Sequence, residues 1–290
     1  YTANPRAELY IGLINERLHL LRKAGIRLHV IDIRDYHLVS STLTQIKPDV
    51  VIHLAAIAHA NRSNKDPFST FDHSMRTLEN VLDVISSRGT HLIYFSSSMV
   101  YGNFDGKEVD ENTICNPIGI YGTLKLSGEL LVKAYNNVFD LPYTIIRPSA
   151  LYGERCVSRR VGQIFIENAL QNLDITINGD GDEKLDFTYI KDLVQGIKLS
   201  CENKSAINQI FNITFGNSRT IKKLIEILRG EFPQIKIIQK PREKLMPIRG
   251  TLSNSKAKKL LNYNPEYQLE VGYVQYIKWY KNFYLKLVKD

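Results

Sequence analysis

The sequence predicts an α/β fold, with a parallel sheet that has helices on both faces and a smaller α/β lobe after it. Through the first half of the chain, short continuous apolar runs alternate with amphipathic stretches. That alternation is typical of strands that are buried on both faces and joined by helices. Beyond residue 153 the pattern is less regular, which indicates a second unit. We therefore divide the chain into residues 1–153 and 154–290, and expect some elements of the second part to pack back on the first.

Four apolar runs are the predicted strands, at residues 28–32, 50–54, 91–95 and 143–146. Each run is short and rich in β-branched, leucine or aromatic residues. The first predicted helix starts at Asn4-Pro5, a capping residue followed by proline, and ends near Ala24, before Gly25. The other predicted helices lie near 38–46, 67–88, 117–138, 160–172, 219–230, 254–261 and 270–287.

The composition is that of an ordinary globular protein, with 290 residues of which 43% are hydrophobic and 23% charged. No run approaches the roughly 18 apolar residues of a membrane helix, and the first residues do not resemble a signal peptide. The cysteines Cys115, Cys156 and Cys201 are widely spaced, which fits reduced thiols and no metal site. The net charge of +8 comes from scattered residues. We expect a cytoplasmic protein without a nucleic-acid or membrane partner.

A glycine-rich turn after the first strand is needed where a dinucleotide pyrophosphate approaches the backbone. None of the 17 glycines supplies such a turn. Gly119 and Gly122 stand at a predicted helix start without a third glycine, and Gly179 and Gly181 belong to the second part of the chain. The first predicted helix corresponds to the second helix of a complete sheet of this kind. We therefore interpret the chain as a fragment that lacks one upstream strand-helix-strand unit, about 30 residues long.

Tyr121 and Lys125 are the first candidates for chemistry, because residues four apart on a helix share one face. Free tyrosine has a pKa near 10, and a neighbouring ammonium stabilises the phenolate that could act as a base. The spacing also arises by chance, so the pair alone is weak evidence. Three serines, Ser96 to Ser98, follow the predicted strand 91–95 and place hydroxyl groups at its end. Such a run is equally typical of a polar turn.

Six segments in order resemble motifs of the extended short-chain dehydrogenase/reductases, the NAD-dependent epimerase/dehydratase family. They are His53-Leu-Ala-Ala-Ile-Ala-His-Ala-Asn-Arg-Ser63, Ser96-Ser-Ser-Met-Val-Tyr-Gly102, Asn116-Pro-Ile-Gly-Ile-Tyr-Gly-Thr-Leu-Lys125, Arg147-Pro-Ser-Ala-Leu-Tyr-Gly153, Gly179-Asp-Gly-Asp-Glu-Lys-Leu-Asp-Phe-Thr-Tyr189 and Ser255-Lys-Ala-Lys-Lys-Leu-Leu-Asn-Tyr263. The resemblance spans nearly the whole chain. It implies a Rossmann-like, doubly wound sheet that binds NAD in residues 1–153, and a sugar-nucleotide lobe in 154–290.

The resemblance also implies roles for single residues. Tyr121 is the base, Lys125 its electrostatic partner, and Ser97 the catalytic hydroxyl, with Ser96 or Ser98 as alternatives one position away. NAD contacts are implied for Asp32, Ile33, Leu54, Ala55, Ala56, Ser96, Tyr121, Lys125 and Pro148. Substrate contacts are implied for Ser98, Met99, Lys184 and Arg249, of which Arg249 would grip a diphosphate.

Departures from the family pattern narrow the expected reaction. Ser98 and Met99 stand where the similar dehydratases carry an Asp-Glu pair, and a thioether cannot transfer protons. The serine run is more similar to the 4-epimerases, including those that act on UDP-uronic acids. Leu185 stands where relatives often have arginine, so that a diphosphate contact is lost or passed to Lys184. Ala150 and Ser74 replace asparagines of many relatives.

These observations predict a UDP-sugar 4-epimerase that works through a transient 4-keto sugar and keeps its NAD bound, an activity typical of polysaccharide biosynthesis. The alternatives are a dehydratase or reductase of the same family and a non-catalytic sugar-nucleotide-binding subunit. The resemblance further implies a homodimer joined through helices 67–88 and 117–138. Leu78, Val81, Leu82 and Val84 fit either that seam or a core face.

Overall fold

A computed structural model describes residues 5–243 and 245–289. Asn4, the predicted capping residue of the first helix, lies outside these residues. In chain order the elements are α1 (Pro5–Lys23), α2 (Tyr36–Ile46), β1 (Val50–His53), α3 (Ala60–Lys65), α4 (Pro67–Phe71), the π-helical η1 (Asp72–Arg76), α5 (Thr77–Ile85), β2 (His91–Phe95), the 3-10 turn η2 (Ser98–Tyr101), α6 (Ile120–Phe139), β3 (Tyr143–Arg147), β4 (Leu151–Tyr152), α7 (Val161–Leu170), β5 (Ile175–Asn178), β6 (Lys184–Leu185), β7 (Thr188–Tyr189), α8 (Ile190–Glu202), the 3-10 turn η3 (Lys204–Ala206), β8 (Gln209–Asn212), β9 (Arg219–Thr220), α9 (Ile221–Glu231), β10 (Ile237–Lys240), α10 (Ser255–Leu261) and α11 (Leu269–Lys289).

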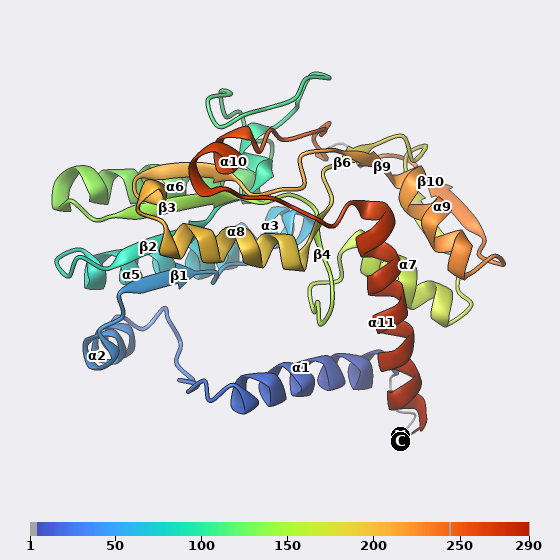
Figure 1. The fold of residues 1–290 in the computed structure, drawn as a ribbon, viewed down its shortest axis with the longest axis horizontal. Helices are drawn as coiled ribbons and strands as arrows, with labels where there is room; N and C mark the ends of the chain where they lie inside the picture. Colours follow the sequence, from blue (N-terminus) through green and yellow to red (C-terminus); the bar gives the residue numbers. More distant parts are fainter. Residues whose placement is uncertain (1–4, 244, 290) are drawn as a thin grey trace.

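The main sheet is parallel throughout and has the order β1-β2-β3-β8 (Figure 1). Strands β2 and β3 are buried at every residue, which explains why their sequences are apolar without alternation. The strands predicted at 50–54, 91–95 and 143–146 are therefore confirmed. Strand β8 was not predicted; it comes from the second part of the sequence and pairs with β3.

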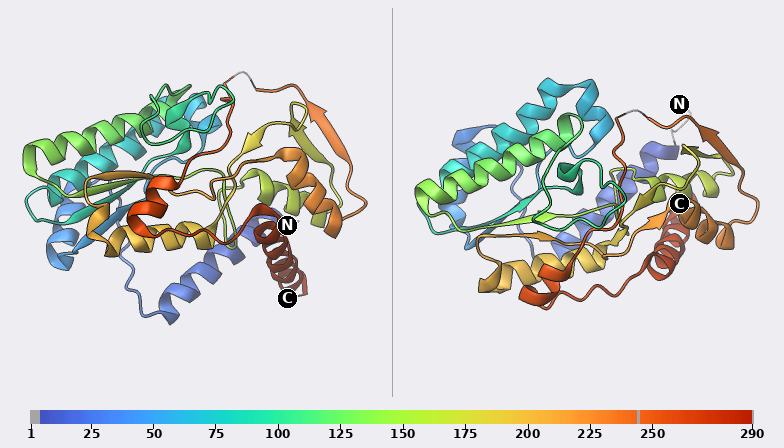
Figure 2. Two further views of the ribbon diagram at one scale, coloured as in Figure 1. Left: turned by 45° about the horizontal axis from the view of Figure 1, so that its top comes forward. Right: turned by 90° about the horizontal axis from the view of Figure 1, so that it is seen from above.

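Helices cover both faces of this sheet, as predicted. Helices α2, α5 and α6 pack on one face, where Leu82, Val132 and Leu92 belong to one buried cluster. Helices α8 and α10 pack on the other, where Leu193 meets Ile93. The right-hand view of Figure 2 shows the sheet between these two layers. The carboxyl ends of the parallel strands thus lie along one edge, which is where open α/β sheets bind their ligands.

Residues 28–32 do not form the predicted strand, which is a correction to the sequence analysis. Leu28 and Val30 expose 44% and 99% of their surface, and the open edge of β1 leaves Ile52 42% exposed. A strand needs a neighbour for its backbone N–H and C=O groups. In the part of the chain that the structure describes, this apolar segment has no strand beside it, so its composition alone cannot make it a strand.

Most predicted helices are confirmed, with changed ends. The predicted helix 67–88 is a continuous run of α4, η1 and α5 that ends at Ile85, with a π-helical stretch in its middle. Its apolar residues Leu78, Val81, Leu82 and Val84 are buried against the sheet, so the structure assigns them to the core rather than to a seam. The helix expected from Pro117 begins at Ile120, whose N–H donates to Asn64 Oδ1 at 3.0 Å. Helix α8 was not predicted.

A second lobe is built from α7, α9 and α11 around three two-stranded sheets, β4-β7, β5-β10 and β6-β9. Its core is rich in tyrosine, with Tyr273, Tyr276 and Tyr280 of α11 fully buried. Helix α1 packs on this lobe, because Leu9 joins the same core and the Tyr10 hydroxyl donates to Glu167 Oε1 at 3.1 Å. Among the described helices, none is long and apolar enough to cross a membrane.

The unpaired segment 26–32 gives a first prediction. Its backbone amides should exchange with solvent about two orders of magnitude faster, or more, than those of β2, because β2 is bonded to strands on both sides. Hydrogen exchange followed by mass spectrometry measures both peptides in one digest. If residues 26–32 are as protected as residues 91–95, the segment is paired with a strand in solution and our description of it is wrong.

Candidate active site

Tyr121 and Ser97 meet at the carboxyl edge of the sheet. Tyr121 lies in the first turn of α6, and Ser97 follows β2 as the capping residue of η2. Burial raises the pKa of Tyr121 above its ordinary value, and a hydrogen bond from Ser97 and the positive charge of Arg160 lower the pKa in opposition. The Ser97 Oγ also accepts the Met99 N–H at 3.2 Å. The predicted base and the predicted catalytic hydroxyl are therefore brought together.

Lys125 lies one helical turn further along the same face and is 6% exposed. Its Nζ donates to the Phe95 carbonyl at 2.6 Å and lies 5.2 Å from the centre of the Tyr94 ring. Burial lowers the pKa of Lys125 to about 8, against the raising effect of Glu129. At neutral pH the ammonium form thus still prevails, but with a narrow margin.

Two glycines allow the turn η2 to lie against the start of α6. Gly122 packs so closely that a Cβ there would come within 2.7 Å of the Met99 carbonyl oxygen. Gly102 ends the turn with φ of +71°, and a Cβ at that position would collide with the Asn116 carbonyl. Both contacts are with backbone, which cannot move aside cheaply. The glycines therefore fix Ser97 opposite Tyr121.

The implied substrate residues Ser98 and Met99 are almost enclosed, with exposed fractions of 2% and 8%. The Ser98 N–H donates to the Pro148 carbonyl at 2.9 Å, which joins the ends of β2 and β3. Pro148 is thereby placed beside the serine turn. Neither position 98 nor position 99 offers an acidic or basic group to a ligand.

Five of the residues implied for NAD, Asp32, Ile33, Leu54, Ala55 and Ala56, lie at the end of β1 and in the turn after residue 31. Leu54 is 61% exposed, whereas Ala55 and Ala56 are half-buried. The Asp32 carboxylate is paired with Arg34, and the Ile33 carbonyl accepts from Asn80 Nδ2 at 3.0 Å, which ties this turn to α5. The arginine pair and a hydrogen bond from the Arg34 amide lower the pKa of Asp32.

Arg249 lies in the segment after β10, whereas Lys184 lies on β6. Burial and the nearby charge of Arg160 lower the pKa of Arg249 to about 10, against the raising effect of Glu183. Lys184 is exposed on β6 and is not among the charges that act on Arg249. The structure instead places Arg160 near both Arg249 and Tyr121, with its Nη2 donating to the Ala58 carbonyl at 2.6 Å.

A buried carboxylate holds the segment that carries Arg249. Asp186 is fully buried, and its carboxylate accepts the N–H groups of Leu252 and Gly216, both at 3.1 Å. The same segment is hydrogen-bonded to the loop after η2, where the Phe104 N–H donates to the Ile248 carbonyl at 2.8 Å. The second lobe is thus fastened to the Ser97 side of the site.

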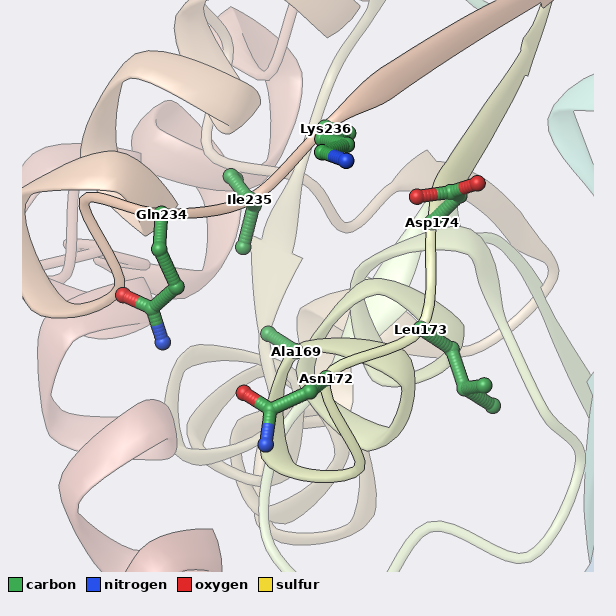
Figure 3. A pocket seen from close by; sticks show the side chains of 7 residues that line it. All are labelled: Ala169, Asn172, Leu173, Asp174, Gln234, Ile235 and Lys236. Atoms are coloured by element: carbon green, nitrogen blue, oxygen red, sulfur yellow. The ribbon is translucent and has the colours of Figure 1, made fainter.

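Two surface hollows lie away from these residues. One, of about 120 Å³, is lined by Ala169, Asn172, Leu173, Asp174, Gln234, Ile235 and Lys236. Figure 3 shows it between the end of α7 and the approach to β10, with no predicted site residue among its lining. The other, of about 330 Å³, lies beside α10. Within the described residues no group of acidic, histidine or cysteine side chains could hold a metal ion.

The sequence profile of the NAD dependent epimerase/dehydratase family matches residues 8–214. The chain belongs to this family. It is 34% identical, over 81% of its length and 77% of the relative's, to a putative UDP-glucose 4-epimerase of Methanocaldococcus jannaschii. The solved UDP-glucose 4-epimerase of Thermotoga maritima with UDP-glucose superposes with a TM-score of 0.84 at 26% identity, over 89% of this chain and 85% of that one. The solved UDP-glucuronic acid 4-epimerase of Bacillus cereus with UDP-glucuronic acid and NAD superposes with a TM-score of 0.82 at 29% identity. The match covers 87% of this chain and 80% of that one.

Membership of the epimerase/dehydratase family confirms the predicted fold class and the predicted cofactor, NAD. Tyr121, Lys125 and Pro148 lie around the ends of β2 and β3 and are the residues that could hold the nicotinamide end of that cofactor. The small, half-buried residues Ala55 and Ala56 follow the end of β1. A glycine-rich turn for the pyrophosphate is not found among the described residues.

Two residues of this site were missed by the sequence analysis. Glu129 is buried one helical turn beyond Lys125. Because residues four apart on a helix share a face, this spacing could have predicted that Glu129 lies beside Lys125. Arg160 had no such signal, because it reaches the site from a loop of the second lobe.

Asp186 gives a second prediction. Its folded-state pKa of about 7 is raised above the ordinary 3.8 by burial, so between about pH 4 and 7 the folded state holds a proton that the unfolded state has lost. The free energy of unfolding that Asp186 contributes should fall as the pH rises through this window. Between about pH 5 and pH 8, the free energy of unfolding of the native protein should fall by roughly 2–3 kcal/mol more than that of Asp186→Asn. Urea unfolding at each pH measures both proteins. An equal pH dependence in both proteins would contradict the prediction.

Proposed function

We propose that the chain is a UDP-sugar 4-epimerase. The observation that carries this proposal is the meeting of Ser97, Tyr121 and Lys125 at a site whose positions 98 and 99 carry no acid-base group. The first two relatives compared above support it, since they carry the names of UDP-glucose 4-epimerases, and the third is a UDP-glucuronic acid 4-epimerase. The sugar and the nucleotide base remain part of the proposal.

The chain's own residues perform the proton transfers. Tyr121 removes the proton of the sugar's C4 hydroxyl and later returns it to the 4-keto sugar, after the sugar has turned its other face. The Ser97 hydroxyl holds the same oxygen and stabilises the Tyr121 phenolate by donating to it. Lys125 places a positive charge one turn away along α6. Bound NAD supplies the reversible hydride acceptor, so the cycle is redox-neutral.

The substrate's diphosphate would be held by guanidinium groups. Arg249 and Arg160 lie close enough for the charge of one to lower the pKa of the other. Two like charges that face one space favour an anionic ligand between them, and guanidinium matches phosphate oxygens in a bidentate way.

A non-catalytic sugar-nucleotide-binding subunit is the second candidate, favoured by the absence of a glycine-rich turn within residues 5–243 and 245–289. NAD binding separates the two candidates. The full reading frame that contains this chain should retain NAD through gel filtration if it is an enzyme. A protein that binds UDP-sugar but no NAD would favour the binding subunit.

The epimerase proposal predicts a product visible by NMR. Incubation with UDP-glucose, UDP-GlcNAc or UDP-glucuronate should give the C4 epimer of at least one of them, without net formation or use of NADH. Tyr121→Phe should lower kcat by about 10²–10⁴, because it removes the acid-base group. Loss of water from the sugar, or stoichiometric NADH, would instead show a dehydratase or a reductase.

A homodimer is the proposed assembly. In the two helices predicted for its seam, the exposed apolar residues are Phe68, Phe71, Leu130, Val138 and Phe139. Leu130 and Val138 lie eight residues apart on one face of α6, with exposed fractions of 59% and 69%. Such a stripe on a helix favours packing against a second helix.

Light scattering tests this assembly. The native chain should have the mass of two copies, and Leu130→Glu with Val138→Glu should reduce it to one, because each buries a charge in the seam. Ile114→Glu, at a loop residue that is 87% exposed, is the matched control and should leave the dimer intact. A monomeric native chain, or an equal effect of the control, would refute the proposal.

A further inference from the structure

Glu129 is enclosed directly beneath the candidate site. Its side chain is 1% exposed and lies on the face of α6 that carries Tyr121 and Lys125, eight and four residues before it. On one side it accepts a hydrogen bond from the Ser96 hydroxyl. Because Ser96 adjoins Ser97, this bond ties the carboxylate to the turn that holds the catalytic hydroxyl.

Arg147 grips the other side of the same carboxylate. Its Nε donates to Glu129 Oε1 at 2.9 Å and its Nη2 to Oε2 at 2.6 Å, a two-pronged pair that is 3% and 1% exposed. The third nitrogen, Nη1, donates to the Tyr101 hydroxyl at 2.9 Å, which in turn donates to Asn212 Oδ1 at 2.8 Å. The carboxylate is thus fixed in place by β2, β3 and β8 together.

The groups that face Lys125 leave Glu129 as its counter-charge. They are His53 on β1, Tyr94 on β2, and Tyr121 and Glu129 on α6. Burial lowers the pKa of His53 to about 4 and raises the pKa of both tyrosines, so these three are uncharged near neutral pH. The Glu129 carboxylate, paired with Arg147, raises the pKa of Lys125 against the effect of burial.

We propose that Glu129 is a positioning residue with two tasks: it holds the Ser96–Ser97 turn against Tyr121, and its buried negative charge keeps Lys125 in the ammonium form. Arg147 orients the carboxylate for both. The effect on catalysis rests on the proposed function, since it requires Lys125 to support Tyr121. The effect of Glu129 on the protonation of Lys125 does not rest on the proposed function.

The titration of Lys125 tests the proposal without substrate or NAD. In protein labelled with ¹⁵N-lysine, the Nζ resonance of Lys125, assigned with Lys125→Arg, is followed from about pH 6 to pH 11. Glu129→Gln keeps the shape and an acceptor oxygen but removes the charge. The midpoint for Lys125 should fall by about one pH unit or more. An unchanged midpoint in the folded variant would overturn the proposal.

Two further variants keep the test decisive. Glu129→Gln leaves Arg147 as a buried cation without a counter-charge, which can prevent folding. Glu129→Gln with Arg147→Met removes both charges and should show the same fall of the Lys125 midpoint. Glu167→Gln is the matched control, because Glu167 is a carboxylate 2% exposed on α7 in the second lobe. A comparable fall in this control would also overturn the proposal.

An activity measurement adds the catalytic consequence. With the sugar nucleotide that the chain epimerises, the alkaline fall of kcat should move to lower pH in Glu129→Gln, with KM little changed, and should stay in place in Glu167→Gln. If no sugar nucleotide is epimerised but the Lys125 midpoint falls, the proposed function fails and the assignment of Glu129 stands. If kcat shifts equally in both variants, the positioning role is overturned.

Discussion

Helix α6 packs against the end of β2 at a distance that only glycine permits. A Cβ at Gly128 would lie 2.1 Å from the Tyr94 hydroxyl, and one at Gly122 would lie 2.7 Å from the Met99 carbonyl oxygen. The contacts of the proton-transfer residues depend on this approach. Successive turns of the helix bring Tyr121 to Ser97 and Lys125 to the Phe95 carbonyl. A helix held further out by a larger side chain would carry the same residues without their partners.

The close approach has an electrostatic consequence. It removes water from an ammonium and a carboxylate on one helix face and from an arginine on the neighbouring strand. Burial of single charges is costly, so each must be matched by an opposite charge or a hydrogen bond. Glu129 pairs with Arg147 and also raises the pKa of Lys125, whose ammonium donates to the Phe95 carbonyl. The polarity of the site therefore follows from packing as much as from residue type.

The second lobe contributes charge from the opposite direction. Asp186, itself buried, holds the backbone that carries Arg249, while Arg160 bonds to the loop after β1. Neither arginine follows a strand of the main sheet. The site is thus composite, with proton-transfer groups from the sheet and its helix, and anion-binding groups from loops of the second lobe.

Local pattern predicted those parts of the molecule whose partners are close in sequence or repeat regularly. The continuous apolar runs of β1, β2 and β3 were readable because strands buried on both faces need them. The spacing of Tyr121 and Lys125 was readable because helical geometry alone puts them on one face. Strand β8 was missed because its place is set by pairing with β3, more than 60 residues earlier. Residues 28–32 were mispredicted for the converse reason, since an apolar run becomes a strand only beside another strand.

The sequence by itself thus determined the α/β class, the family and the residue types at the centre of the site. Only the tertiary structure decided that Leu78 and Leu82 belong to the core, that Arg160 lies near Arg249, and that Glu129 lies beneath Lys125 between Ser96 and Arg147. The reason is physical: periodicity fixes which residues share a face of an element, but burial and charge depend on what that face meets.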